Sequence, residues 1–126
     1  MEKNQQSSKG DFFTECPIAY TARAIGGKWK MSIIWQLHTN GVLRYGELKR
    51  NVDGITNMML TQSLQELQQY DIVKRVQYME VPPKVEYSLT EGGQGLIPAL
   101  EAMATWGKKH MNNEKNIGTI AKNNNS

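Results

Sequence analysis

Uncharged hydrogen-bonding side chains gather on one side of the stretch TNMMLTQSLQELQQY, which runs from residue 56 to residue 70 of the 126-residue chain. A solvated helix face would normally carry Glu, Lys and Arg. Amides and hydroxyls instead donate and accept hydrogen bonds, and Gln and Thr are residues that read base edges in DNA. The pattern therefore favours recognition chemistry on the face formed by Met58, Thr61, Gln62, Gln65 and Gln69.

Leucines form the opposite face of the same stretch. Leu60, Leu64 and Leu67 recur at i, i+4 and i+7, the spacing of an apolar stripe on an amphipathic helix. Two interpretations of this stretch stay open at this point. It is either a recognition helix or an amphipathic core helix whose outer face happens to lack charge.

Cys16, the only cysteine, is the second residue that could do chemistry. It directly precedes Pro17, and proline is common at the first helical position, so we expect the thiol at a helix N-terminus, where the dipole favours a thiolate. Glu15 opposes this effect, and Lys28 and Lys30 would support it only if the fold brings them near. The alternative is a small buried apolar side chain. An accessible thiolate could be alkylated, or form a mixed disulfide or a disulfide with a second copy.

Catalytic and metal-binding chemistry has little support in the sequence. His38 and His110 lie far apart and have no obvious acid-base partner. The segment EGGQG lacks the GxGxxG spacing of a phosphate-binding loop, and no Cys/His cluster has metal-ligand spacing. We therefore expect a protein that is not an enzyme and that uses no cofactor and no metal.

Charge and hydropathy restrict the partners. The chain has 15 basic and 12 acidic residues, a net charge of +3 that suits a polyanion. The whole excess lies between Cys16 and Thr90, where nine basic residues face six acidic ones. No apolar run approaches the roughly 18 residues of a membrane span, and the N-terminus lacks the apolar core of a signal peptide. We expect a cytoplasmic protein that does not contact membranes.

Composition divides the chain into three parts. Residues 1–11 are polar and predict a flexible arm. Residues 12–111 predict one domain with a modest core, and residues 112–126, with six Asn, predict a disordered polar tail.

Helical periodicity predicts several helices within the domain. The first begins at Pro17 and ends at a Gly-Gly pair, and the next carries the stripe Trp29, Ile33, Leu37 and should be the best buried. A short helix over residues 44–52 ends at the break Asp53-Gly54, directly before the amide-lined stretch. Helix, tight turn with Gly, helix is the signature of a helix-turn-helix.

Two β-rich runs follow, residues 72–79 and 85–89, joined by a tip that contains Pro82-Pro83. Val42-Leu43 could add a third strand, and a helix-turn-helix followed by such a hairpin is a winged helix. Thr90 then predicts the N-cap of a helix that runs to about residue 111. Its apolar surface either packs within the monomer or forms a dimer interface with the first helix. The predicted fold class is mainly α with a small β-hairpin.

The chain closely resembles the HxlR-type family of bacterial winged-helix transcription regulators over about residues 16–106. The motifs that carry the resemblance are CPIAYTARAIGGKW, LRYGELKR, DGITNMMLTQSLQELQ, VPPKVEYSLTEGG and the late Trp-Gly. The resemblance implies a homodimer held by the first and last helices that binds a repeat in double-stranded promoter DNA, as repressor or activator. Several relatives sense oxidants or electrophiles through a cysteine at the place of Cys16.

The resemblance also implies which residues contact DNA. The helix that begins at Thr56 would lie in the major groove, the preceding helix would position the backbone, and the wing would reach flanking phosphates or the minor groove. Two departures stand out: Met58 replaces the Lys of many relatives, and Tyr70-Asp71 replaces the usual Asp-Gly. A regulator without a thiol switch, and a winged helix used only for protein contacts, remain alternatives. The implied DNA-binding residues are Arg44, Lys49, Thr56, Asn57, Met58, Thr61, Gln62, Gln65, Arg75 and Lys84.

Overall fold

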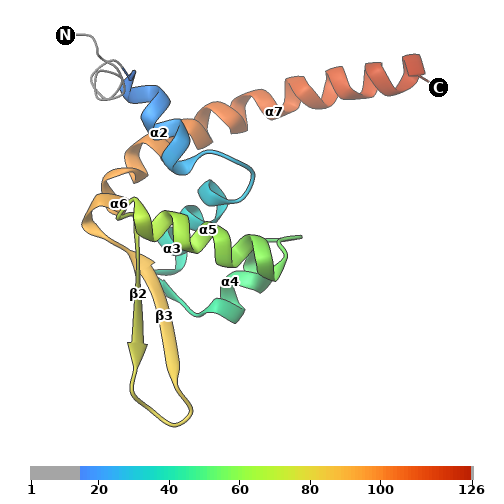
Figure 1. The fold of residues 1–126 in the computed structure, drawn as a ribbon. Helices are drawn as coiled ribbons and strands as arrows, with labels where there is room; N and C mark the ends of the chain where they lie inside the picture. Colours follow the sequence, from blue (N-terminus) through green and yellow to red (C-terminus); the bar gives the residue numbers. More distant parts are fainter. Residues whose placement is uncertain (1–14, 126) are drawn as a thin grey trace.

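The computed structural model describes the backbone of residues 15–125 and the side chains of residues 15–111, so the predicted arm over residues 1–11 lies outside the described residues. Most of the described chain is helical, and one small antiparallel sheet completes it (Figure 1). The predicted class, mainly α with a small β-hairpin, is confirmed. The elements in chain order are α2 (Pro17–Ile25), α3 (Lys30–Asn40), β1 (Val42–Leu43), α4 (Tyr45–Asn51), α5 (Asn57–Gln69), β2 (Val73–Tyr78), β3 (Lys84–Leu89), α6 (Glu91–Gly95) and α7 (Ile97–Asn125).

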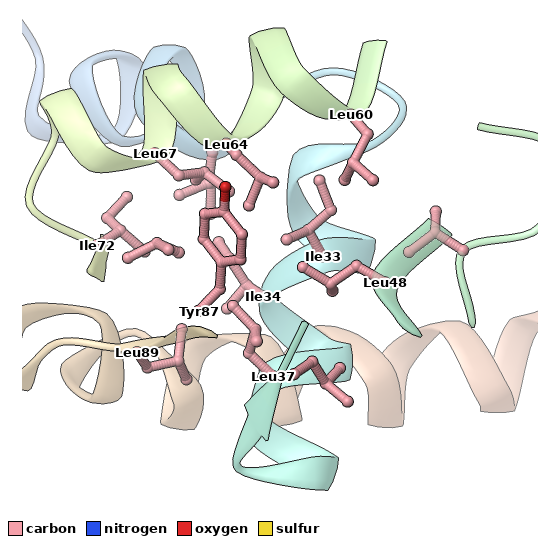
Figure 2. Close-up of a cluster of buried hydrophobic side chains, with 14 of the residues drawn as sticks. Ile33, Ile34, Leu37, Leu48, Leu60, Leu64, Leu67, Ile72, Tyr87 and Leu89 are labelled. Atoms are coloured by element: carbon pink, nitrogen blue, oxygen red, sulfur yellow. The ribbon is translucent and has the colours of Figure 1, made fainter. Parts of the chain in front are cut away.

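Helix α3 is the central helix, as its apolar stripe predicts. It contacts α4, α5, α7 and both β1 and β3. Ile33, Ile34 and Leu37 are buried on it, and Figure 2 shows them meeting leucines of α5 and Tyr87 of β3. Burial of several large aliphatic side chains at about 1.5–3 kcal/mol each fixes how the helix-turn-helix and the wing lie relative to one another.

The helix-turn-helix consists of α4 and α5. Leu48 of α4 and the three leucines of the α5 stripe are buried in the common core (Figure 2). In the turn between the helices, Gly54 has φ +85°, which only glycine adopts at little cost, and Trp29 packs 3.7 Å from where a Cβ would lie. The core therefore sets the crossing of the two helices and leaves the other side of α5 exposed.

A residue with a left-handed backbone ends α5. Asp71 has φ +58°, and the hydrogen bonds Asp71 N–H to Gln68 C=O and Ile72 N–H to Leu67 C=O form a Schellman motif. The hydroxyl of Thr90 donates to the Asp71 carbonyl and ties this turn to the start of α6. The turn into the wing therefore keeps the geometry that glycine would adopt, with an aspartate in its place.

The wing is the β2–β3 hairpin, which extends beyond the helices in Figure 1. The sheet order is β1-β3-β2, so Val42-Leu43 does add the third strand. Tyr87 and Leu89 are buried and alternate with more exposed residues, as the sequence pattern predicts. One face of the hairpin thus covers the helices, and the other faces solvent.

The last helical region differs from the prediction of one helix that starts after Thr90. Thr90 does cap α6, its hydroxyl accepting from Gly93 N–H at 2.9 Å, but the chain turns at Leu96 before α7 begins. Pro98 explains the break, because it lacks the N–H that a continuous helix would need and fits the first turn of a new one. Ile97 and Leu100 of α7 are buried against the core.

The backbone of α7 continues to Asn125. The disordered tail that composition predicts for residues 112–126 stays a prediction. In Figure 1 this helix projects away from the winged helix. Among the described residues, no helix is both long enough and apolar enough to cross a membrane.

Candidate nucleic-acid interface

The outer face of α5 is exposed and carries no charge along its centre. The Met58 side chain is 76% exposed, although it is large and apolar. Thr61, Gln62, Gln65 and Gln69 are also exposed, while the leucines behind them are buried. The structure therefore brings five of the residues singled out by sequence onto one accessible surface, which we call the outer face of α5.

Tyr45 of α4 fixes one edge of this face. Its hydroxyl lies 3.0 Å from the carbonyl oxygen of Asn57 and 3.1 Å from Oγ1 of Thr61. The side-chain oxygen of Asn57 is 3.3 Å from the same hydroxyl. A single phenol thus connects the two helices of the helix-turn-helix and restricts the rotamers of two candidate contacts.

An ion pair bounds the other edge. Glu66 lies 2.7 Å from Nζ of Lys30 on α3 and accepts a hydrogen bond from Nε2 of Gln62 at 3.2 Å. The Lys30 ammonium and the Gln62 amide lower the pKa of the Glu66 carboxyl. The carboxylate is therefore an acceptor held between a cation and an amide of the outer face.

Thr56 has a structural task at the start of α5. Its hydroxyl accepts a hydrogen bond from Met59 N–H at 3.1 Å, which makes it the N-cap. The free N–H groups of this helix N-terminus also favour a nearby anion such as a phosphate.

Three basic residues lie in or next to α4, the helix that precedes α5 in the chain. Arg44 is the N-cap of α4, and its backbone N–H donates to the Glu47 carboxylate at 2.8 Å. The residue is exposed. Lys49 is half-buried and Arg50 is exposed, both in the last turn of α4. The sequence predicts DNA contacts from Arg44 and Lys49. The structure shows that Arg50 is more exposed than Lys49.

The two candidate residues of the wing lie on opposite faces of the hairpin. Arg75 pairs across the strands with buried Tyr87 and shares its face, whereas Lys84 pairs with Tyr78 on the other face. Nζ of Lys84 is 3.7 Å from the Glu86 carboxylate and 4.7 Å from the Tyr78 ring centroid. Arg75 is exposed and has no salt bridge within the described residues. Lys84 therefore already has an ion-pair partner, whereas Arg75 has none among the described residues.

Cys16 is the N-cap of α2 and is exposed, so the predicted position at a helix N-terminus is correct. The nearby carboxylate of Glu15 is paired with the guanidinium of Arg23, which offsets its charge. Lys30 reaches the other end of α2, where Nζ is 3.5 Å from the Ala24 carbonyl oxygen, so it does not lie beside the thiol.

Apolar side chains remain exposed on the first and last helices. Ile18 of α2 is 77% exposed and Trp106 of α7 is 64% exposed. Trp106 stacks on the His110 ring with centroids 4.1 Å apart, while Met103 and Met111 extend the exposed surface of α7. This apolar surface is of the kind that marks an interface.

Tyr45, Lys30 and Glu66 were not chosen as site residues from the sequence. Helical periodicity registers the ring of Tyr45 as apolar and gives no sign of the hydrogen bonds that its hydroxyl makes to α5. Lys30 and Glu66 lie on different helices, so their ion pair cannot be predicted from the spacing of residues within one helix. The one feature of the sequence that could have indicated this ion pair is Glu66, an acidic residue next to an otherwise uncharged helix face.

A helix-turn-helix whose second helix exposes an amide-lined face, followed by a two-stranded wing, defines the winged helix-turn-helix class. The model of the HxlR-like helix-turn-helix family matches residues 24–115. The chain therefore belongs to this family of transcriptional regulators.

Two relatives illustrate the family. The chain is 52% identical over 96 residues to the putative regulatory protein MalR of Fusobacterium mortiferum, a match covering 76% of this chain and 91% of that protein. It is 47% identical over 95 residues to the HTH-type transcriptional regulator YtcD of Bacillus subtilis (strain 168), covering 75% of each. Both are regulators and not enzymes, in agreement with the expectation from sequence.

Solved structures with the same fold include two forms of the redox regulator HypR. Its oxidised form is 45% identical with a TM-score of 0.70, covering 75% of this chain and 96% of that chain. Its reduced form is 40% identical with a TM-score of 0.75, covering 80% and 99%. The crystal structure of YtcD is 44% identical with a TM-score of 0.74, covering 78% and 99%.

Proposed function

We propose that this HxlR-type regulator binds promoter DNA sequence-specifically as a homodimer, with α5 in the major groove. The outer face of α5 carries this proposal. It is exposed, it is lined with groups that match base edges, and Tyr45 and Lys30 brace its two edges. Arg44, Lys49 and the wing supply cations for phosphates around it. Because the proposed partner is promoter DNA, we expect the protein to act in the cytoplasm.

Exposed apolar surface on α2 and α7 supports the homodimer. A monomer would leave Ile18 and Trp106 in water, and a second copy that covers them would remove that cost. A dimer also presents two copies of α5, which can bind two half-sites about 34 Å apart or a multiple of it.

We further propose that Cys16 is a redox-responsive thiol. Its exposure at a helix N-terminus supports this function, as does the likeness of the chain to HypR, a redox regulator solved in oxidised and reduced forms. With one cysteine per chain, the available products are an adduct, a mixed disulfide, or a disulfide between two copies.

Binding to genomic fragments tests the proposed function. We expect the wild type to retain a preferred fragment at physiological salt, where non-specific complexes dissociate. On that fragment, Gln62→Ala should lose roughly 1–3 kcal/mol of binding free energy, the scale of one good base contact, while its affinity for random DNA stays unchanged. Fluorescence anisotropy with both duplexes measures the difference.

A winged helix used only for protein contacts would behave differently in this experiment. It should bind all fragments weakly, with a strong dependence on salt and no preferred sequence. An equal loss of affinity for specific and random DNA in Gln62→Ala would show that this residue does not read a base.

A further inference from the structure

Lys30 lies outside the outer face of α5, yet two contacts connect it to that face. Nζ of Lys30 is 2.7 Å from Oε1 of Glu66, and Oε2 of Glu66 accepts from Nε2 of Gln62 at 3.2 Å. The Lys30 side chain is only 12% exposed, and Nζ is also 3.5 Å from the carbonyl oxygens of Arg23 and Ala24. The cation is therefore held between the end of α2 and the last turn of α5.

The ionised carboxylate of Glu66 determines the orientation of the Gln62 side-chain amide. A carboxylate accepts hydrogen bonds and donates none, so Gln62 must turn its NH₂ group and not its oxygen toward Glu66. A glutamate is ordinarily ionised at neutral pH, and Lys30 and Gln62 lower the pKa of the Glu66 carboxyl further. One N–H of Gln62 is thereby occupied, and one N–H and the carbonyl oxygen remain for a ligand.

We propose that Lys30, acting through Glu66, is a positioning residue that orients Gln62 to read adenine. This inference rests on the proposed function. In the major groove, adenine presents an acceptor at N7 and a donor at N6, which match one N–H and one carbonyl oxygen. Guanine presents two acceptors, N7 and O6, and would require the N–H group that Glu66 already binds. The arrangement therefore selects adenine over guanine at the base that Gln62 faces.

Lys30 has a second effect on the same contact. Glu66 lies at the edge of a face that must approach phosphates, and an uncompensated carboxylate there would be repelled by them. The ammonium of Lys30 removes most of that repulsion and holds the carboxylate in one place. Without it, both the position of Glu66 and the orientation of the Gln62 amide are lost.

The test measures base preference at one position of the binding site. Selection of wild type and Gln62→Ala on a randomised duplex library identifies this position, because the variant loses its preference there. Fluorescence anisotropy then gives the ratio of affinities for duplexes with A and with G at that position. We expect a ratio of about tenfold for the wild type and within about twofold for Lys30→Met and Glu66→Gln, since one bidentate contact is lost. The amide of Glu66→Gln can donate as well as accept, so Gln62 can turn over.

Two further variants separate positioning from stability and from charge. Lys30→Arg keeps the cation and should restore the preference for adenine. Lys28→Met removes an exposed lysine two residues away, whose Nζ lies 4.9 Å from the Trp29 ring centroid, and should leave the ratio unchanged. Melting temperatures verify folding. If Lys30→Met does not fold, Glu66→Gln, which keeps the side-chain shape, decides the result.

Outcomes that overturn the inference are distinct from those that overturn the function. A wild-type ratio retained in Glu66→Gln, or a wild-type preference for a base other than adenine at this position, overturns the positioning role and leaves the proposed function intact. A wild type with no preferred DNA sequence overturns the proposed function and the inference with it.

Discussion

At the residue scale, Met58 is the one apolar side chain on a face otherwise lined with amides and a hydroxyl. It lies in the first turn of α5, and residues at the N-terminus of a recognition helix contact base edges. An exposed thioether cannot read the polar groups of a base edge well. It matches the C5-methyl group of thymine, the apolar feature of the major groove.

We expect one thymine in each half-site to depend on Met58. Replacing that thymine by deoxyuridine removes only its methyl group, and should weaken wild-type binding about fourfold, equivalent to about 0.8 kcal/mol for one buried methyl. Met58→Ala should bind the two duplexes equally, and Met58→Leu should still distinguish them. If every thymine-to-uracil change affects wild type and Met58→Ala alike, Met58 does not contact a methyl group.

Sequence could predict this face because helical periodicity alone decides which side chains share it. The leucines at i, i+4 and i+7 fix the buried side, and the amides must then lie opposite. The sequence could not predict the contacts that hold the two edges of this face. Tyr45 and Thr61 belong to different helices, and so do Lys30 and Glu66, so their contacts depend on how the core sets the crossing of those helices.

At the scale of elements, the turn from α5 into the wing carries a measurable strain. Asp71 is the one non-glycine residue with a positive φ among the described residues, and it is the C′ residue of a Schellman motif, where glycine is most favourable. Sequence showed the departure from Asp-Gly. The structure shows that the turn itself is kept.

We expect Asp71→Gly to raise the free energy of unfolding by about 0.5–1 kcal/mol, because relief of left-handed backbone strain exceeds the added entropy of the unfolded chain. Asp53→Gly, at a turn residue without a positive φ, is the matched control and should be neutral or destabilising. Urea denaturation of both variants measures the effect. A decrease in both would show that Asp71 is unstrained.

The wing gives a prediction about its two faces. Arg75 shares the face of Tyr87, which covers the helices, whereas Lys74 and Lys84 point to the opposite face, and Lys84 is already paired with Glu86. Arg75→Ala should therefore reduce the slope of log affinity against log salt by about one unit per phosphate contact, or about two for a dimer. Lys74→Ala and Lys84→Ala should change it less. The reverse order would place the other face of the wing on DNA.

Sequence was less successful at the end of the chain. Pro98 breaks the predicted last helix into α6 and α7, because it lacks the N–H that a continuous helix would need there.

At the scale of the whole molecule, the thiol and the proposed DNA-reading face lie on different elements, so a response to oxidants would require that α2 and α5 be coupled. Cys16 begins α2, whose last carbonyls contact Lys30, which in turn pairs with Glu66 of α5. Exposed Ile18 on the same helix lies on the proposed dimer surface. A modification at Cys16 therefore acts on a helix that contacts α5 and carries part of the proposed dimer surface.

We expect diamide or a quinone to change the operator affinity of the wild type, and Cys16→Ser to bind DNA without responding. Diamide takes two protons and two electrons from two thiols, and the disulfide that forms joins two copies at the ends of α2 or joins Cys16 to a small thiol. Either product should crowd the proposed dimer interface and alter the separation of the two α5 helices, which must match half-sites about 34 Å apart or a multiple of it. Non-reducing electrophoresis and intact mass identify the product, and anisotropy on the operator gives the affinity. An unmodified thiol after treatment, or an equal response in Cys16→Ser, would show that Cys16 is not a redox switch.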